Sequence, residues 1–436
     1  MFILLFAFVA SVIYSCNSDD GIKPNDPDPI GEPEPEPVKE ITGESLIFDK
    51  ALVDDSYVLL SEVTNHRVYL ISKEKGELLH EWKLDYELGN DAELMRDGKL
   101  LVALKSKNPD PEISFGGYGG RVQIINPDGS LNWDFEYSSD SYIPHHDVEL
   151  LPNNNILILV WEKKSKAEAI EAGYGANENI EILVPEAIIE VNPTNNNIVW
   201  EWHAWDHLIQ DIDNTKSNYG DVALNPQLID VNHAPRENGD IMHANGFDFD
   251  SEKNLIFLSM NFYNEVWVID HSTTTQEAKL HSGGNFNKGG DLVYRFGNPM
   301  AYKNSNGSQI FFNNHFPNLL EGTENGKGNI LIYMNGNVDR QSKVYELKMP
   351  NVYSLEPNMN NEPQILWEYT HPDLYSPILG GAVRLENGNT LITEPGFGFW
   401  EVSPSGEVVW KFKNDVLVWR GYNYAKNNPG IKAIGL

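Results

Sequence analysis

The chain has 436 residues, a single cysteine and a formal charge of -32, from 64 acidic against 32 basic residues. Nucleic-acid binding depends on lysines and arginines that neutralise phosphates, so we expect no nucleic-acid partner for so acidic a chain. Because there is no second cysteine, we also expect neither an internal disulfide nor a cysteine-ligated metal.

The first 15 residues form a short apolar run that ends in IYS, with Cys16 directly after it. This order is typical of a bacterial lipoprotein signal peptide, which is removed before the new N-terminal cysteine is acylated. The run is shorter than the roughly 20 apolar residues that cross a bilayer. We therefore expect a signal peptide over residues 1–15, lipidation of Cys16, and anchoring to the outer membrane, facing the periplasm or the cell surface. The lipid anchor is the only membrane contact that we expect.

Residues 17–40 read NSDDGIKPNDPDPIGEPEPEPVKE, in which prolines alternate with acids and almost nothing is apolar. Such a segment stays extended and solvated because it has too little apolar surface to bury. We assign residues 16–42 to the lipidated cysteine and a disordered linker, and residues 43–436 to one folded domain.

A turn followed by an alternating strand that carries tryptophan recurs within residues 43–436. The copies are KGELLHEW (75–82), DGSLNWDF (128–135), NNNIVWEW (195–202), EPQILWEY (362–369) and SGEVVWKF (405–412). A second unit, an aliphatic hairpin around an Asn/Gly/Asp turn, appears as ELMRDGKLLVAL (93–104), ELLPNNNILILV (149–160) and VRLENGNTLIT (383–393). Both units have the composition of tight β-hairpins.

Paired short strands with a tryptophan motif at intervals of roughly 40 to 70 residues predict a radial array of four-stranded blades. The five tryptophan copies, with a further strand pair at LIFLSM and EVWVID (255–270), predict an all-β fold, a six-bladed β-propeller. We expect the tryptophans to pack between blades, because large aromatic side chains fill such wedges.

The glycine-rich stretch GGNFNKGGDLVYRFG (283–297) lacks the G-x-x-x-x-G-K-[ST] spacing of a phosphate-binding loop and opens no predicted helix. We interpret it as a loop between strands. A nucleotide therefore has no evident cradle, and we expect no cofactor.

Three histidines occupy comparable places in the predicted repeats. The slot before the inner strand of a blade holds Asn90 in one repeat, His146 in another and Gly380 in a third. His243 in MHANGFDFD and His315 in NNHFPNLL are assigned to the same slot. Since inner strands line the propeller axis, the three imidazoles are expected to share one polar funnel. There they are able to ligate a metal, bind an anion, or supply a nucleophile and charge stabilisation.

An ordered set of motifs from about residue 54 to the C-terminus resembles the bacterial arylsulfotransferase family. The motifs are HHDVELLPNNN (145–155), WDHLIQD (205–211), NYGDV (218–222), MHANGFDFD (242–250), VWVIDHSTTT (266–275), KGGDLVYRFGNP (288–299), NNHFPNLL (313–320), GNILIYMNGNVDRQSKVYEL (328–347), GGAVRLENGNTLI (380–392), SGEVVWKF (405–412) and WRGYNYAKNNPG (419–430). The resemblance implies a six-bladed propeller that moves a sulfuryl group from a phenolic sulfate ester to a phenol without a nucleotide donor.

The resemblance also implies roles for single residues. His315 would carry the sulfuryl group as a sulfohistidine in a ping-pong reaction, while His146 and His243 stabilise the developing charge, with no metal ligand in the site. The arginine that clamps the sulfate in relatives falls 18 residues after the second histidine, where this chain has Asn261. We expect substrate binding by Asn261, Arg295, Asn245 and Asp147. Arg295 is the first choice for the missing cation, and Arg340 and Arg420 are alternatives.

Other functions stay open at this point. A non-catalytic surface propeller would bind sulfated glycans or aromatic ligands without turnover, and Asn261 favours that alternative. A metal-dependent hydrolase would use the three histidines as ligands. A hydrolytic sulfatase is not expected, because the C/S-x-P-x-R nucleophile motif does not occur in the sequence.

Overall fold

Short strands joined by tight turns make up most of the described chain, as the alternating sequence patterns predict. The structure is a computed structural model that describes residues 40–108, 111–175, 180–321, 326–336 and 340–436. The predicted signal peptide, Cys16 and almost all of the predicted linker lie outside these residues. Within them, no helix is long and apolar enough to cross a membrane.

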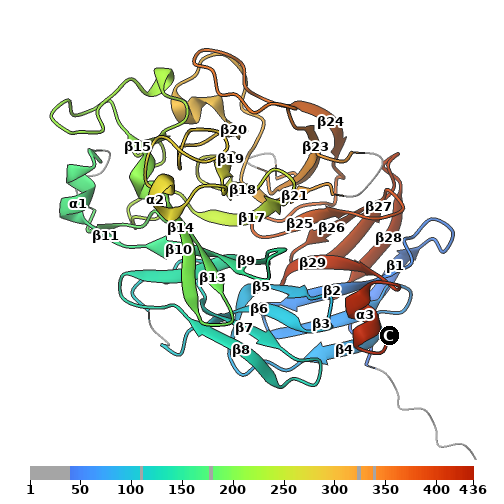
Figure 1. Ribbon diagram of the computed structural model, residues 1–436. Helices are drawn as coiled ribbons and strands as arrows, with labels where there is room; N and C mark the ends of the chain where they lie inside the picture. The colour runs from blue at the N-terminus through green and yellow to red at the C-terminus, as the bar shows by residue number, and fades with distance from the viewer. Residues whose placement is uncertain (1–39, 109–110, 176–179, 322–325, 337–339) are drawn as a thin grey trace, which may run out of the picture. The chain divides into compact units, whose positions relative to one another are not determined.

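The described residues form six large antiparallel sheets arranged as blades around an axis, which confirms the predicted propeller (Figure 1). Blades 1 to 3, each from the inner strand outward, are β29 (Val418–Ala425), β2 (Ser56–Glu62), β3 (Arg67–Ser72) and β4 (Leu78–Trp82); β5 (Leu88–Leu94), β6 (Leu100–Lys105), β7 (Gly120–Ile125) and β8 (Leu131–Glu136); β9 (Tyr142–Leu150), β10 (Ile156–Glu162), β13 (Glu186–Asn192) and β14 (Asn197–His203).

Blades 4 to 6 follow the same order and complete the ring. They are β17 (Ala244–Asp250), β18 (Leu255–Met260), β19 (Glu265–Asp270) and β20 (Tyr294–Phe296); β21 (Asn314–Leu319), β22 (Ile330–Met334), β23 (Lys343–Lys348) and β24 (Gln364–Tyr369); β25 (Gly381–Arg384), β26 (Thr390–Glu394), β27 (Gly398–Val402) and β28 (Val408–Lys413), with β1 (Glu44–Phe48) added outside β28. The predicted strand pair at 255–270 is β18 and β19 of blade 4.

Short helices and two small sheets decorate the connections between the strands. They are β11 (Lys164–Ser165), α1 (Lys166–Glu171) and β12 (Ile182–Leu183); the 3-10 helix η1 (Ala204–His207), β15 (Leu208–Ile209), η2 (Val222–Leu224) and β16 (Ile229–Asp230); α2 (Thr275–Ala278); η3 (Pro299–Tyr302); and α3 (Pro429–Ala433). The segment from η1 to β16 joins blade 3 to blade 4, and α2 lies in the loop between β19 and β20.

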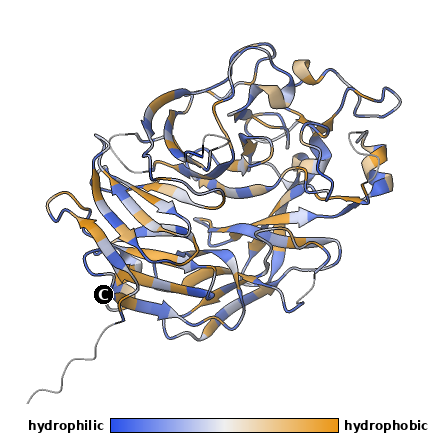
Figure 2. Ribbon diagram, turned by 180° about the vertical axis from the view of Figure 1, so that it is seen from behind, coloured by the Kyte–Doolittle hydropathy of each residue, from blue (hydrophilic) through white to orange (hydrophobic). Residues whose placement is uncertain are grey.

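Apolar residues alternate with polar ones along many strands (Figure 2), and each blade buries its apolar residues against its neighbours. Six clusters of buried side chains each draw on two successive blades around the ring. Trp82, Trp202 and Trp410 are almost fully buried in three of these clusters. The predicted packing of tryptophans between blades is therefore confirmed for these three.

The ring closes where the two ends of the folded chain meet the sheets. The C-terminal strand β29 supplies the inner strand of blade 1 through its pairing with β2, and β1 pairs with β28 at the outer edge of blade 6. Strands that are far apart in sequence thus complete blades 1 and 6. We call the contact between these two blades the seam, and the stability of the ring depends on it.

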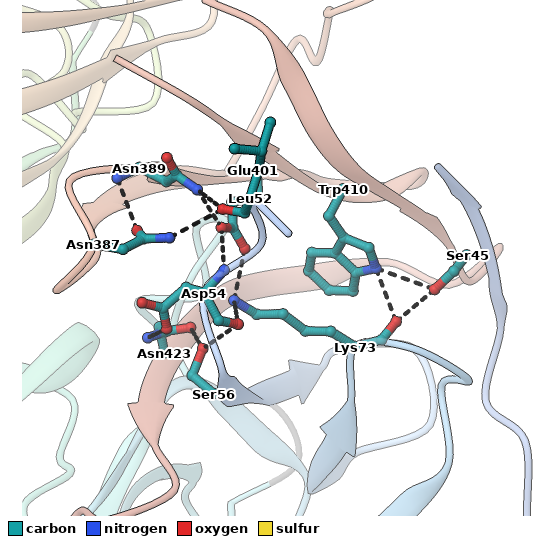
Figure 3. A network of polar contacts seen from close by, with 10 residues as sticks. All are labelled: Ser45, Leu52, Asp54, Ser56, Lys73, Asn387, Asn389, Glu401, Trp410 and Asn423. Carbon is teal, nitrogen blue, oxygen red and sulfur yellow. Dashed lines mark hydrogen bonds and ion pairs between the residues drawn. The ribbon is translucent and has the colours of Figure 1, made fainter. Parts of the chain in front are cut away.

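A buried polar network joins blades 1 and 6 at the seam (Figure 3). Lys73 on blade 1 donates to Glu401 on blade 6 at 2.7 Å, and their side chains are 3% and 0% exposed. Asn389 and the backbone N–H of Asp54 also donate to Glu401, each at 2.7 Å. The indole of Trp410 donates to the Lys73 carbonyl at 2.9 Å and to Ser45 on β1 at 3.1 Å. Burial makes each of these bonds costly to break.

We predict that Glu401→Gln lowers the free energy of unfolding by about 3–5 kcal/mol, because it leaves the buried Lys73 ammonium without a counter-charge. Equilibrium urea unfolding measures the loss. The matched control is Glu252→Gln, which removes the exposed ion pair of Glu252 with Lys327, 67% and 56% exposed. The control should change stability by less than about 1 kcal/mol. Equal losses in the two variants would contradict the role of the seam.

Candidate active site

The inner strands carry irregular residues at the places where the sequence analysis set the histidine slot. Asn90, His146 and Gly380 have φ values of 128°, 54° and 95°, and His243 has 52°. The strand registers shift at this place in β5, β9 and β17. Asparagine and glycine recur in the slot because they adopt positive φ most readily. Histidine does so at some cost, and strained residues of this kind concentrate at functional sites.

His146 and His243 lie in contact, as predicted. Their ring centroids are 5.0 Å apart, and both rings approach Trp161, with centroids at 5.6 Å and 5.7 Å. His146 is 2% exposed, whereas the His243 side chain is 18% exposed. Solvent therefore reaches this group of side chains mainly beside His243.

His315 shares the same electrostatic environment. It lies on β21, is 7% exposed, and its Nδ1 faces the Asn313 carbonyl at 3.5 Å. Burial, followed by the charges of His243 and Arg420, lowers the pKa of His315 to about 3. Burial also holds the pKa of His146 well below its usual value, and the charges of His243 and His315 lower it further. The structure thus gathers the three predicted imidazoles near the axis.

Two of the predicted substrate-binding amides are bound within the protein. Asn245 and Asn261 both donate to the backbone carbonyl of Asn314, at 2.7 Å and 3.3 Å. Both residues lie beside His243. Asn245 follows it by two positions, and Asn261 donates its backbone N–H to the His243 carbonyl at 3.2 Å. Their amide nitrogens hold the start of β21, the strand that carries His315.

Asp147 is the ion-pair partner of Arg420 at the axis. It accepts from the guanidinium and from the Phe247 backbone N–H, each at 2.9 Å. Arg420 also donates to the Asn245 carbonyl at 2.9 Å and lies over the Phe316 ring at 4.0 Å. A Cβ on Gly246 would stand 2.2 Å from the guanidinium, so a larger residue there would displace Arg420. Asp147 therefore orients Arg420 beside the residue that follows His315.

The structure does not bring Arg295 to the histidines. Arg295 lies on β20, the outermost strand of blade 4, where it is fully buried and ion-paired with Glu265. Its guanidinium also donates to the backbone carbonyls of residues 226 and 228. Of the arginines considered from the sequence, Arg420 is the one whose charge acts on His146 and His315.

A buried chain of two further residues leads away from His146. Its Nδ1 lies 2.8 Å from Nδ1 of His145, whose Nε2 lies 2.8 Å from Oε2 of Glu186. The other carboxylate oxygen of Glu186 accepts from the Ala244 N–H at 2.8 Å and from the Trp161 indole at 3.1 Å. The sequence analysis missed this relay, although the doublet in HHDVE shows the first histidine.

The relay has two proton arrangements, which differ by one proton in total and by the tautomer of His146. With Glu186 ionised, His145 holds its proton on Nε2, His146 holds one on Nδ1, and Nε2 of His146 is a base. With Glu186 protonated, each proton shifts along the chain and Nε2 of His146 becomes a donor. Burial raises the pKa of Glu186 and lowers the pKa of both histidines. The added proton is therefore stored on the carboxyl group, and no charged imidazole forms.

His243 has its own carboxylate partner, and a cation lies at its open side. Its Nδ1 is 2.6 Å from Asp240 Oδ2, which fixes the ring. The other face of the imidazole stacks on Phe262 at 4.8 Å, and the exposed Arg236 guanidinium lies 3.8 Å from the centre of the Phe262 ring. The more accessible edge of the site is thus aromatic and positively charged.

The fold and the site define a six-bladed propeller that gathers three imidazoles near its axis, with two buried carboxylates as hydrogen-bond partners of the histidines. The sequence profile of the arylsulfotransferase (ASST) family matches residues 44–417, and the chain belongs to this family. It is therefore an aryl sulfotransferase by family.

Comparison with curated proteins gives no match. Among solved structures, a Bacteroides fragilis protein proposed to be a 6-phosphogluconolactonase has 13% identity, covers 86% of this chain and 100% of its own, and has a TM-score of 0.42. A Lactobacillus plantarum protein has 10% identity, 82% coverage of both chains and a TM-score of 0.41. Kuenenia stuttgartiensis hydrazine synthase has 13% identity, 67% and 68% coverage and a TM-score of 0.37. Similarity at this level adds nothing about function.

We predict that Glu186→Gln locks His146 in the form with its proton on Nε2. The two donors that meet Oε1 of Glu186 fix the amide oxygen of glutamine there, so its NH₂ group faces His145 and reverses the proton order. Nitrogen-15 spectra of histidine-labelled protein, recorded as the pH is raised, measure this tautomer. In the unchanged chain the His146 proton should move to Nδ1 when Glu186 ionises, whereas in Glu186→Gln it should stay on Nε2.

The control for this spectrum is Glu190→Gln. Glu190 forms a comparable pair with His271 at 2.9 Å, in which the two side chains are 6% and 9% exposed. That variant should change the His271 signals and leave those of His146 as they are. If raising the pH moved the His146 proton from Nε2 to Nδ1 in Glu186→Gln as it does in the unchanged chain, the relay would not set the tautomer.

Proposed function

We propose that the chain transfers a sulfuryl group from a phenolic sulfate ester to a phenol by a ping-pong mechanism through His315, without a nucleotide donor. The observation that carries the proposal is a buried imidazole with a pKa of about 3, close to two further histidines. An imidazole attacks only when neutral, and this one stays neutral at physiological pH. Lipidation of Cys16 would keep the reaction in the bacterial cell envelope, at the outer membrane.

In the first half-reaction, the lone pair of the His315 Nε2 attacks the sulfur of the ester. The Asn313 carbonyl beside Nδ1 favours a proton on that nitrogen, which leaves Nε2 free. The N–S bond forms as the S–O bond to the aryl group breaks, and the phenolate takes a proton from Nε2 of His146. The lost proton is replaced along the chain from His145 and Glu186, so the relay ends with Glu186 ionised.

In the second half-reaction, the oxygen of an acceptor phenol attacks the sulfur of the sulfohistidine. The N–S bond breaks, the imidazole of His315 leaves as a neutral base, and the phenol proton passes to Nε2 of His146. Glu186 is protonated again at the other end of the relay. The same three residues are thus acid in one half-reaction and base in the other.

Positive charge for the sulfuryl oxygens is available from several directions. The charge of Arg420 acts on His146 and His315, so it also favours an anion between them. His243 is fixed by Asp240 with its side chain partly exposed. Arg236, for which no carboxylate partner is found in the described part of the chain, lies on Phe262 at the open edge. We assign to Arg236 the attraction of the sulfate ester that relatives obtain from the arginine replaced by Asn261.

The glycine-rich loop at 283–297 supports a donor other than a nucleotide. Its backbone amides at Asn285 and Phe286 donate to Ser272 and Asp270, at 2.7 Å and 3.0 Å. A Cβ on Gly289 or Gly290 would stand 2.0 Å from a backbone carbonyl. The glycines here serve close packing of the loop, so its amides are not directed at a phosphate.

A second candidate function is a propeller that binds sulfated glycans or aromatic ligands without turnover. It is favoured by the pairing of Arg420 with Asp147, which uses part of its charge, and by Asn261 in place of an arginine. This function predicts saturable binding of an aryl sulfate with no release of phenol.

We predict that 4-nitrophenyl sulfate leaves one sulfuryl adduct on the protein and releases one equivalent of nitrophenol when no acceptor is present. Intact mass spectrometry and absorbance measure the two products. His315→Ala should lose both, whereas His371→Ala, which changes a histidine in the loop that follows β24, the outer strand of blade 5, should keep them. Saturable binding without adduct or nitrophenol would support the binding-only function and contradict the transferase.

The nitrophenol burst should keep its rate between about pH 8 and pH 5. His315 is active when deprotonated, and its pKa of about 3, against 6.5 for a free imidazole, keeps it deprotonated over this whole range. Stopped-flow absorbance on folded protein measures the burst. Nitrophenolate is a good leaving group and needs no proton from His146, so the protonation of the relay should not change the rate of this step. A loss of rate with a midpoint near pH 6.5 would contradict a buried His315 nucleophile.

A further inference from the structure

A second histidine cluster lies away from the inner strands, between η1 and the loop that follows α2. One ligand atom from each of His207, His281 and Asp291 lies within 4.8 Å of the other two. Nδ1 of His207 and Nδ1 of His281 are each 2.8 Å from Oδ1 of Asp291. Two nitrogens and one oxygen therefore converge, and they connect the segment between blades 3 and 4 with the long β19–β20 loop.

The proton positions at His207 leave its Nδ1 lone pair directed at the carboxylate. Its Nε2 is 2.8 Å from the Ala278 carbonyl, which only accepts, so the proton of a neutral His207 lies on Nε2. The lone pair of Nδ1 and the carboxylate then face each other at 2.8 Å, an arrangement that needs a cation, either a proton or a metal ion. A backbone carbonyl on the second nitrogen is the usual support of a metal-binding histidine.

The backbone around His207 holds its ring in this orientation. A Cβ on Gly290 would stand 2.4 Å from Nε2 of His207 and 2.0 Å from the Ala278 carbonyl, so a larger residue would displace the ring. Trp202 lies parallel to the imidazole at 6.1 Å and donates to the Gly290 carbonyl at 2.8 Å. His207 is fully buried and Asp291 is 4% exposed. Two of the three ligands are thus held rigidly in place.

We propose that His207, His281 and Asp291 bind one Zn²⁺ ion. Two imidazole nitrogens and one carboxylate oxygen are ligands that zinc prefers, and three protein ligands leave a position for water or another ligand. The His281 side chain is 64% exposed and lines a cleft of about 640 Å³ with Trp205 and Asp206. The open position therefore faces solvent. Zinc bonds of about 2.0 Å in a tetrahedral arrangement place the ligand atoms about 3.3 Å apart. The exposed imidazole of His281 is free to move outward to this spacing.

This site is separate from the axial histidines and does not depend on the sulfotransferase reaction. The Nδ1 of His146 and both ring nitrogens of His145 are used in the relay to Glu186. Within the described residues, the group of three with converging ligand atoms is the one at His207. The sequence analysis did not name these residues as metal ligands: His207 and Asp291 lie in separate motifs, and His281 lies in none of them.

The test uses the full chain without a polyhistidine tag, treated with a chelator and then titrated with Zn²⁺ by calorimetry. We expect one Zn²⁺ per chain and a rise in the melting temperature. His281→Ala should weaken binding at least about tenfold, because it removes a ligand while the exposed position keeps the fold. His371→Ala, which removes a surface histidine 3.8 Å from Asp373, is the matched control and should bind like the unchanged chain.

His146→Ala distinguishes the two histidine clusters and should retain the bound Zn²⁺. Zinc binding that is lost in His146→Ala and kept in His281→Ala would overturn the proposal and place the ion at the axis. Equal affinity of the unchanged chain and His281→Ala, or no binding to the unchanged chain, would overturn it as well.

Discussion

The site depends on the ion pair between the Arg420 guanidinium and Asp147 at the propeller axis. Inner strands of successive blades converge at the axis, and here they bring Asp91 and Asp147 together in a fully buried place. Burial and the neighbouring Asp147 charge raise the pKa of Asp91, which shows how unfavourable two carboxylates are there. Arg420 offsets this by pairing with Asp147, and Tyr422 of the same strand donates to Asp91 at 2.8 Å. Both come from β29, the last strand, so the axial site is complete only when the ring has closed.

The same burial explains why the axial histidines are neutral. A charged imidazole in a closed space loses its hydration, and the pKa values of His145, His146 and His315 all fall for this reason first. In the proposed mechanism a neutral His315 is the nucleophile, and the relay gives up a proton with the charge appearing on Glu186 and not on an imidazole. The fixed positive charge therefore comes from Arg420, which stays charged in any surroundings. In the proposed function the neutral histidines react with an anion that the charge of Arg420 favours.

Much of the fold was predictable because each repeat contains its own strand signals. The tryptophan motif marks the outer strand of a blade, as in β4, β8, β14, β24 and β28, and the Asn/Gly hairpin joins the inner strand to the second one. The histidine slot was also visible, since positive φ selects asparagine and glycine at Asn90 and Gly380. The partners of the histidines were not predictable. Glu186 and Asp240 reach the site through the pairing of strands and loops, and Arg295, assigned to the site from sequence, lies on an outer strand.

What separates the two histidine clusters is the group bonded to the second ring nitrogen. For His145 that group is the Glu186 carboxylate, which either accepts or gives a proton, so the imidazole passes protons to His146. For His207 it is the Ala278 carbonyl, which only accepts, so one proton stays in place and the other nitrogen keeps its lone pair. The first arrangement suits acid–base chemistry and the second suits a ligand. One residue type thus serves two purposes in one fold, and its neighbours rather than its own chemistry decide between them.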